Sequence, residues 1–67
     1  MSPQHYKSYT IWGYAKPNDN GTYEATGSVS KGDQLLEGSE SLGTFDTFEA
    51  AQSAGIEWAK GWVDSQG

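Results

Sequence analysis

The C-terminal third of the chain carries a one-sided apolar stripe, which constrains the fold more than any other feature. At about 100° per residue, one broad face of a helix would hold Phe48, Ala51, Gly55, Trp58, Ala59, Trp62 and Val63. Thr47 precedes the stripe and is typical of a helix N-cap, and Glu49 stands in the first turn, where the helix dipole favours a negative charge. We therefore expect a single helix of about 17 residues with one face that must be buried.

Two segments upstream of the helix alternate in the manner of strands. The first runs from Tyr9 to Lys16, and its two faces carry Tyr9, Ile11, Gly13 and Ala15 against Thr10, Trp12, Tyr14 and Lys16. The second runs from Thr22 to Ser30 and sets Tyr23, Ala25, Gly27 and Val29 against polar residues. Asn20-Gly21 lies between them and supplies the backbone freedom that a tight hairpin needs. The two segments predict an antiparallel hairpin.

A third strand is expected between Gln34 and Phe45, after a turn at residues 31–33. Its pattern is the weakest, because the apolar residues Leu35, Leu36, Leu42 and Phe45 do not all fall at alternate positions, on one side of a strand. A bulge near Gly38 or Gly43 would restore the alternation.

The order of these elements predicts an α+β fold of the β-β-β-α type. In it, a three-stranded antiparallel meander packs on one C-terminal helix. We expect a flexible N-terminus at residues 1–8, a single domain at residues 9–64 and a C-terminal tail at residues 65–67. Trp58 and Trp62 are expected to be mostly buried against Ile11, Tyr23 and Phe45. Gly55 indicates a close approach of the helix to the sheet, and Gly27 marks either a bulge or such a close crossing by the helix.

Composition weighs against several classes of function. The 67 residues include no Cys and one His, so disulfides and thiolate metal sites are impossible. No catalytic, cofactor-binding or metal-binding residues are predicted, and we do not expect an enzyme. The net charge is −5, with four scattered Lys and no Arg, which weighs against nucleic acid and anionic membranes. The sequence shows neither a signal peptide nor an apolar run of membrane-spanning length, so we expect a cytoplasmic protein.

The run Leu42-Gly43-Thr44-Phe45-Asp46-Thr47, which leads into the Ala-rich start of the helix at Ala51, resembles a known class of DNA-binding domain. These are the ethylene-response-factor domains of plants and the N-terminal domains of tyrosine-type phage integrases, which share the β-β-β-α order. The resemblance implies a sheet face that enters the major groove with basic residues and a Trp. Thr22, Ser28 and Ser41 stand at those positions here. The chain also looks like small uncharacterised bacterial proteins of this layout.

A candidate interaction surface lies on the sheet face opposite the helix. Trp12 and Tyr14 would stand there beside Glu24, Thr26 and Ser28. Exposed aromatic rings among small polar residues suit a protein-binding or self-associating surface, although cross-strand aromatics also stabilise sheets without binding anything. The expected partner is an unknown protein or a second copy. The alternative is a nucleic-acid-binding domain of the response-factor or integrase type.

Overall fold

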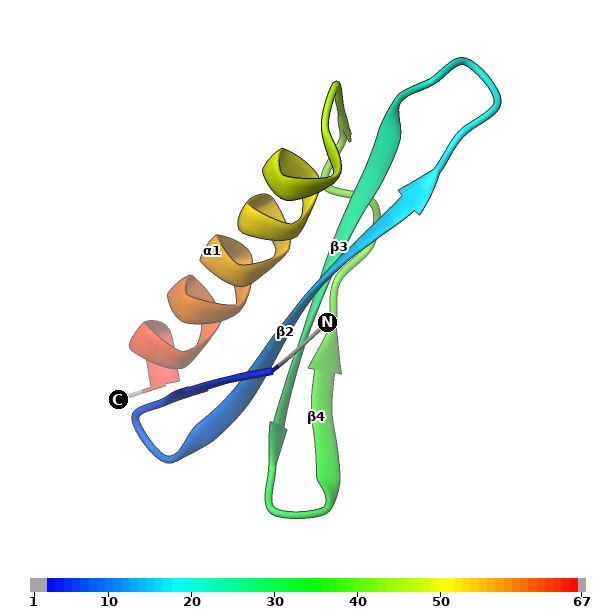
Figure 1. Cartoon of the computed structure of the whole chain (residues 1–67). Coiled ribbons are helices and arrows are strands. Elements are labelled where there is room, and N and C mark those ends of the chain that lie inside the picture. Colours follow the sequence, from blue (N-terminus) through cyan, green and yellow to red (C-terminus); the bar gives the residue numbers. More distant parts are fainter. Residues whose placement is uncertain (1–2, 67) are drawn as a thin grey trace.

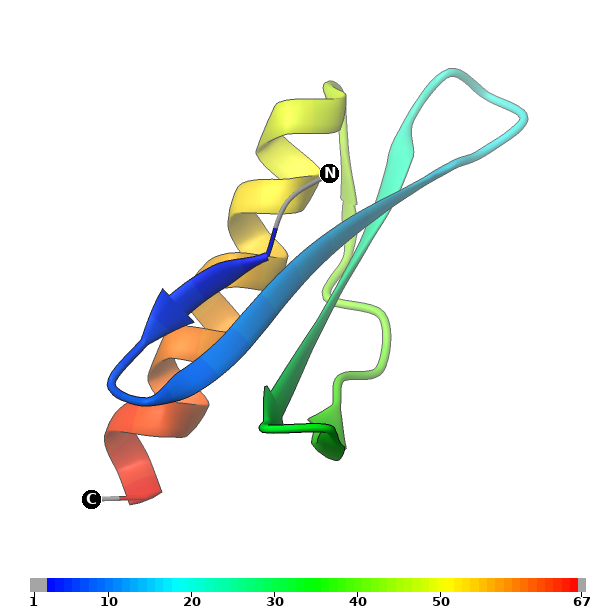
Figure 2. The ribbon, with the colours of Figure 1, turned by 60° about the horizontal axis from the view of Figure 1, so that its bottom comes forward.

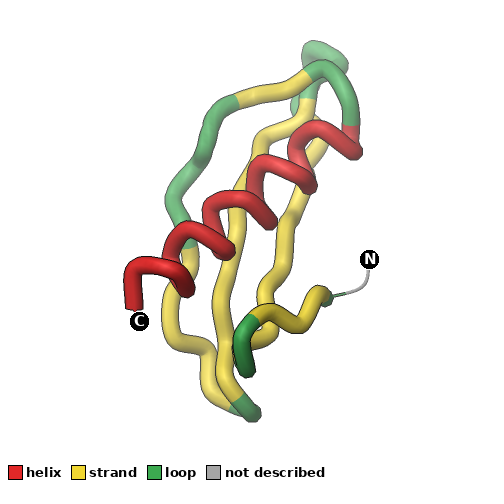
Figure 3. Tube along the Cα trace, turned by 90° about the vertical axis from the view of Figure 1, so that its left-hand side faces the viewer, coloured by secondary structure: helices red, strands yellow, loops and turns green. Residues whose placement is uncertain are grey.

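A computed structural model of the chain describes residues 3–66, which form one antiparallel sheet with one helix packed across it. The helix, α1 (Phe48–Gln66), lies over the two central strands, β2 (Tyr9–Pro17) and β3 (Tyr23–Lys31) (Figures 1 and 3). The two long strands and the C-terminal helix confirm the α+β class. The opposite face of the sheet has no helix on it in the described part of the chain.

The prediction of three strands is wrong, because the sheet has a further strand at its N-terminal edge. The strand order is β1-β2-β3-β4, with a short β5 also paired to β3. Strand β1 (Gln4–Tyr6) pairs antiparallel with β2 and sets Gln4 opposite Ile11. It falls inside the segment predicted to be flexible, of which residues 1 and 2 lie outside the described residues.

The third predicted strand is divided into two short pieces on the same edge of β3. Strand β4 (Gln34–Gly38) pairs with the end of β3, and β5 (Thr44–Phe45) pairs with its start. The register shifts between Val29 and Ser30, which leaves Leu36 as an extra residue on β4. A bulge therefore exists, but at Leu36 rather than at Gly38 or Gly43.

The turn between β1 and β2 is unusual in its residues. Lys7 and Ser8 both have positive φ, 49° and 74°, in a two-residue connection of the type I′ kind that normally takes Asn or Gly. The turn is tied to the end of the helix, because Lys7 Nζ and Tyr6 Oη both donate to Asp64 Oδ1, at 2.8 and 2.9 Å. Figure 2 shows β1 beside α1. We call this three-residue contact the Asp64 clasp.

The helix begins as the sequence predicts. The backbone N–H of Ala50 donates to Thr47 Oγ1 at 3.1 Å, so Thr47 is the N-cap. The helix extends through Gln66 and has 19 residues, slightly more than the 17 or so expected from the sequence. Residue 67 lies outside the described residues.

The closest approach of helix and sheet is a backbone contact between three glycines. Gly13 and Gly27 are register partners on β2 and β3, and Gly55 of the helix lies over both. A Cβ at Gly55 would meet the carbonyl oxygen of Thr26 and come within 2.8 Å of the Gly13 Cα. A Cβ at Gly27 would come within 2.5 Å of the Gly55 carbonyl oxygen. The close approach predicted at Gly55 is confirmed, and of the two alternatives for Gly27 the structure shows the close crossing by the helix.

The core is correspondingly narrow. The fully buried apolar side chains are Ile11, Ala25, Val29, Ala51, Ala59 and Val63. Trp58 and Trp62 are largely buried, as expected, but they pack at the flank of the cluster that contains Ile11 and not at its centre. Trp62 meets Tyr9 edge-on at 6.0 Å between centroids, while Tyr23 meets Phe48 at 5.9 Å. Large rings are displaced to the flanks because the centre of the interface admits only small side chains.

Alanine substitutions at two helix glycines should have opposite effects. Gly55→Ala should lower the free energy of unfolding by about 1–3 kcal/mol, because overpacking forces the backbones apart. Gly61→Ala should raise it by up to about 1 kcal/mol, because Ala is the better helix former. A Cβ at Gly61 would meet nothing within 4 Å. Denaturant unfolding checks both, and effects of the same sign would contradict the glycine contact.

The Asp64 clasp should weaken in acid. Hydrogen bonds from Lys7 and Tyr6 lower the pKa of Asp64 in the folded chain. The stabilisation is therefore present above the ordinary Asp pKa of about 3.9 and is lost as the pH falls through the lower folded value. Amide chemical shifts of residues 4–8, followed from pH 7 to 2, should show this step. The step should disappear in Asp64→Asn, and its persistence there would assign it to another group.

Candidate interaction surface

The uncovered side of the sheet is defined by the alternation of β2 and β3. Residues 11, 13 and 15 of β2 face the helix, so the side chains between them face away from it. Register pairing places Trp12 opposite Ser28, Tyr14 opposite Thr26 and Lys16 opposite Glu24. We call this side the open face; its residues are His5 on β1, Thr10, Trp12, Tyr14 and Lys16 on β2, Glu24, Thr26, Ser28 and Ser30 on β3, and Leu35 on β4.

Trp12 and Tyr14 form the apolar centre of the open face. Their rings are parallel within 2°, with 6.3 Å between centroids. Tyr14 is 42% exposed and Trp12 is half-buried. Ser28 Oγ donates to Tyr14 Oη at 3.4 Å, and Ser28 is only 8% exposed. The two rings therefore form a parallel aromatic pair, which lies beside the buried hydroxyl group of Ser28 on the neighbouring strand.

The predicted surface residues are brought together as expected. Trp12 and Tyr14 lie on β2, and Glu24, Thr26 and Ser28 lie directly across from Lys16 and from these two rings on β3. Their adjacency is a result of the hairpin register, which the alternation in both strands predicts.

Five residues of the open face were not included in the predicted surface. Thr10 and Ser30, like Lys16, were assigned to the correct strand face but left out of that surface. Leu35 is 66% exposed opposite Ser30, and the bulge at Leu36 conceals its parity in the sequence. His5 reaches the face through β1, where its Nδ1 lies 3.5 Å from Thr10 Oγ1. Lys16 was assigned to the correct strand face, and the alternation could have placed it in the candidate surface.

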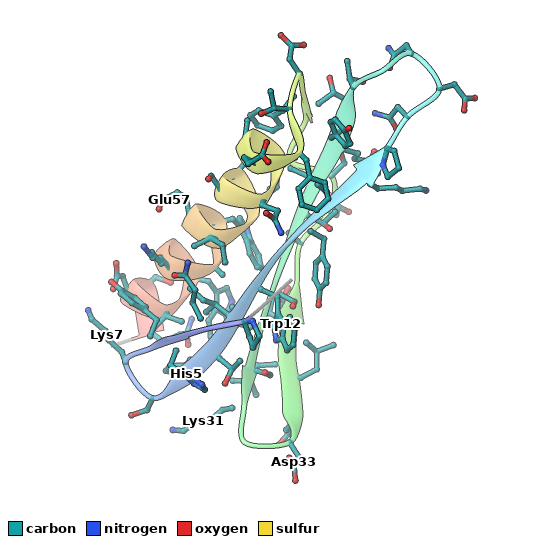
Figure 4. The ribbon with its side chains drawn as sticks, viewed as in Figure 1. His5, Lys7, Trp12, Lys31, Asp33 and Glu57 are labelled. Carbon is teal, nitrogen blue, oxygen red and sulfur yellow. The ribbon has the colours of Figure 1, made fainter. Side chains whose placement is uncertain are left out.

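Charge is distributed unevenly between the open face and the rest of the molecule. Among the ten residues of the open face, the charged pair is Lys16 and Glu24, so their sum is zero. The other acidic residues lie elsewhere, for example Glu57 on the outer side of the helix and Asp33 at the β3–β4 turn (Figure 4). The open face is thus close to neutral in a chain of net charge −5.

A shallow cleft of about 480 Å³ lies on the other side of the molecule, between α1 and β2. Gln4, Gly13, Gln52 and Ile56 line it together with Glu49, Ser53, Glu57 and Lys60. Lys60 and Glu57 form an ion pair at 3.7 Å in its wall. The cleft contains carboxylates, amides and one ammonium group, and no three of the described His, Asp and Glu residues are arranged to hold a metal ion.

Residues 2–67 match a protein family described as a domain of unknown function, DUF6566, and the chain belongs to that family. No curated protein and no solved structure matches the chain. The resemblance of the run from Leu42 to Ala51 to response-factor and integrase domains therefore has no match at the level of the fold behind it. Within residues 3–66, α1 lacks the apolar length that would let it cross a membrane.

Two neighbouring residues on opposite faces of β2 should differ in their effect on stability. Ile11→Ala should lower the free energy of unfolding by about 2–5 kcal/mol, because Ile11 is fully buried under the helix. Trp12→Ser should cost less than half as much and leave the helical circular dichroism unchanged, because the rest of the core does not depend on it. An equal or larger loss for Trp12→Ser would make the aromatic pair a structural element of the fold.

Proposed function

We propose that this domain is a non-catalytic binding module that recognises a protein surface through its open face. The observation that carries the proposal is the parallel pair of Trp12 and Tyr14 on a sheet face without a covering helix. Tyr and Trp are enriched where protein surfaces meet, because each buries a large apolar area and retains a polar edge.

The surroundings of the aromatic pair support a protein partner. Thr10, Thr26 and Ser30 carry partly exposed hydroxyl groups that can donate and accept hydrogen bonds at a polar rim. The low charge of the face matches the depletion of charged residues at the centres of protein interfaces. An apolar centre with hydroxyl groups around it is the composition that such interfaces have.

The same face is poorly suited to nucleic acid. Duplex binding depends on several Lys or Arg contacts to phosphates, each of which adds to affinity and to its salt dependence. On the open face Lys16 has Glu24 directly opposite it. In the response-factor and integrase domains, basic residues and a Trp contact the DNA. The corresponding positions of this chain carry Thr22, Ser28 and Ser41.

Affinity capture from the source cells tests the proposal. The parent domain and two single variants serve as bait: Trp12→Ser on the open face and Glu57→Ser on the outer face of the helix. A partner that is retained by the parent and by Glu57→Ser but lost with Trp12→Ser, and that binds again when purified, supports the proposal. A partner lost equally with both variants, or with neither, contradicts binding through the open face.

Titration with duplex and single-stranded DNA at low salt tests the alternative. We expect no saturable amide shifts in residues 10–16 and 22–30, because the face lacks a basic cluster. Phosphate binding is strongest at low salt, so this condition favours detection. Saturable shifts along these two strands that weaken steeply with added salt would establish the nucleic-acid-binding function instead.

A further inference from the structure

We infer that the partner of the open face is a second copy of this chain, which packs sheet against sheet about a two-fold axis that runs between β2 and β3. The inference rests on the proposed function and specifies its partner. In the described residues no element covers this face, and its residue pattern is complementary to itself. The complementarity has three parts: side-chain size, charge and area.

The first part is side-chain size. On the open face β2 presents large side chains, Trp12, Tyr14 and Lys16, and β3 presents short ones, Thr26, Ser28 and Ser30. A two-fold axis parallel to the strands and midway between them places β2 of one copy over β3 of the other at the same height. Because Trp12 pairs with Ser28 and Tyr14 with Thr26 in register, each aromatic ridge then lies over a row of hydroxyl side chains. Two sheets packed in this way lie about 10 Å apart, with their strands within about 30° of each other.

The second part is charge. The same axis sets Lys16 of one copy over Glu24 of the other, twice per dimer. Lys16 and Glu24 are register partners within one chain, yet neither takes part in an ion pair among the described residues. Both charges are therefore available to a second copy. Two acidic chains repel each other, and the near-neutral open face is the surface through which that repulsion is weakest.

The third part is area. The described fold measures 38 by 20 by 16 Å along its principal axes. The outline of the whole molecule seen on this side is at most 38 by 20 Å, on the order of 760 Å², which is close to the ~800 Å² that each partner contributes to a standard interface. The stretches of β2 and β3 that carry the open face, residues 10–16 and 24–30, are shorter than this outline, since a strand rises about 3.3 Å per residue. An interface of standard size must therefore include the strand ends and turns around the ten residues as well.

Sedimentation equilibrium at chain concentrations from about 5 μM to about 1 mM tests the inference. This interval covers roughly the dissociation constants of dimers of moderate affinity. We expect a species of twice the 7.3 kDa chain mass. Lys16→Glu and Glu24→Lys should each weaken dimerisation roughly tenfold or more, because each places like charges opposite one another. An equimolar mixture of the two variants should dimerise about as tightly as the parent, since both contacts of the mixed dimer again set a carboxylate over an ammonium group.

Glu57→Lys is the matched control, because it changes the net charge as Glu24→Lys does but lies on the outer face of the helix. It should dimerise at least as tightly as the parent. Amide spectra establish that each variant is folded, and concentration-dependent shifts of the parent at residues 10–16 and 24–30 report the interface independently. A parent that stays monomeric to 1 mM, or a mixture no tighter than its components, overturns the second-copy inference. These outcomes leave the proposed function standing, because it is decided separately by partner capture and by the DNA titration.

Discussion

The structure depends on one contact, the meeting of helix and sheet backbones at Gly13, Gly27 and Gly55. Because these three positions have no Cβ, the helix backbone packs directly against the strands. The carbonyl oxygen of Gln52 lies against Gly13, and that of Gly55 lies against Gly27. The buried residues on the helix are Ala51, Gly55, Ala59 and Val63, four apart along one line. A small side chain every fourth residue keeps the whole length of the helix close to the strands.

This close contact determines where the large side chains can go. Since the interface admits Ala and Gly at its centre, Trp58 and Trp62 fill its flank and Trp12 stands on the other side of the sheet. The result is a two-layer domain with a narrow core, in which one sheet face is left to solvent. At the C-terminal end of the helix, the Asp64 clasp and the edge-on contact of Tyr9 with Trp62 hold α1 against the β1–β2 hairpin.

Strong local patterns made part of this structure predictable. The alternation in β2 and β3 determined which side of each strand is buried, and Thr47 marked the start of the helix. Strand β1 was missed because Lys7-Ser8 lacks the Asn or Gly that signals a type I′ turn. The contact that stabilises this turn in their place is made by Asp64, which lies 57 residues away in the sequence. The break between β4 and β5 was missed because backbone and hydroxyl groups of residues 39–43 bond to β3 without regular pairing. The role of Gly13 in the close contact was not predicted. It depends on the carbonyl oxygen of Gln52, which lies on the helix and is remote in the sequence.

The resemblance to DNA-binding domains and the absence of their chemistry have a common physical explanation. A hairpin with a helix across it always presents one free sheet face, whatever that face carries, so the order of elements determines the shape of the surface and not its ligand. Here the face carries two aromatic rings, a row of hydroxyl groups and one charge of each sign, Lys16 and Glu24. The other acidic residues of the chain are not among its ten residues. Desolvating such a face costs little electrostatic energy and gains apolar contact. A partner suited to such a face is another low-charge surface of similar width, and the proposed dimer would supply one in a copy of the same face, with Lys16 over Glu24.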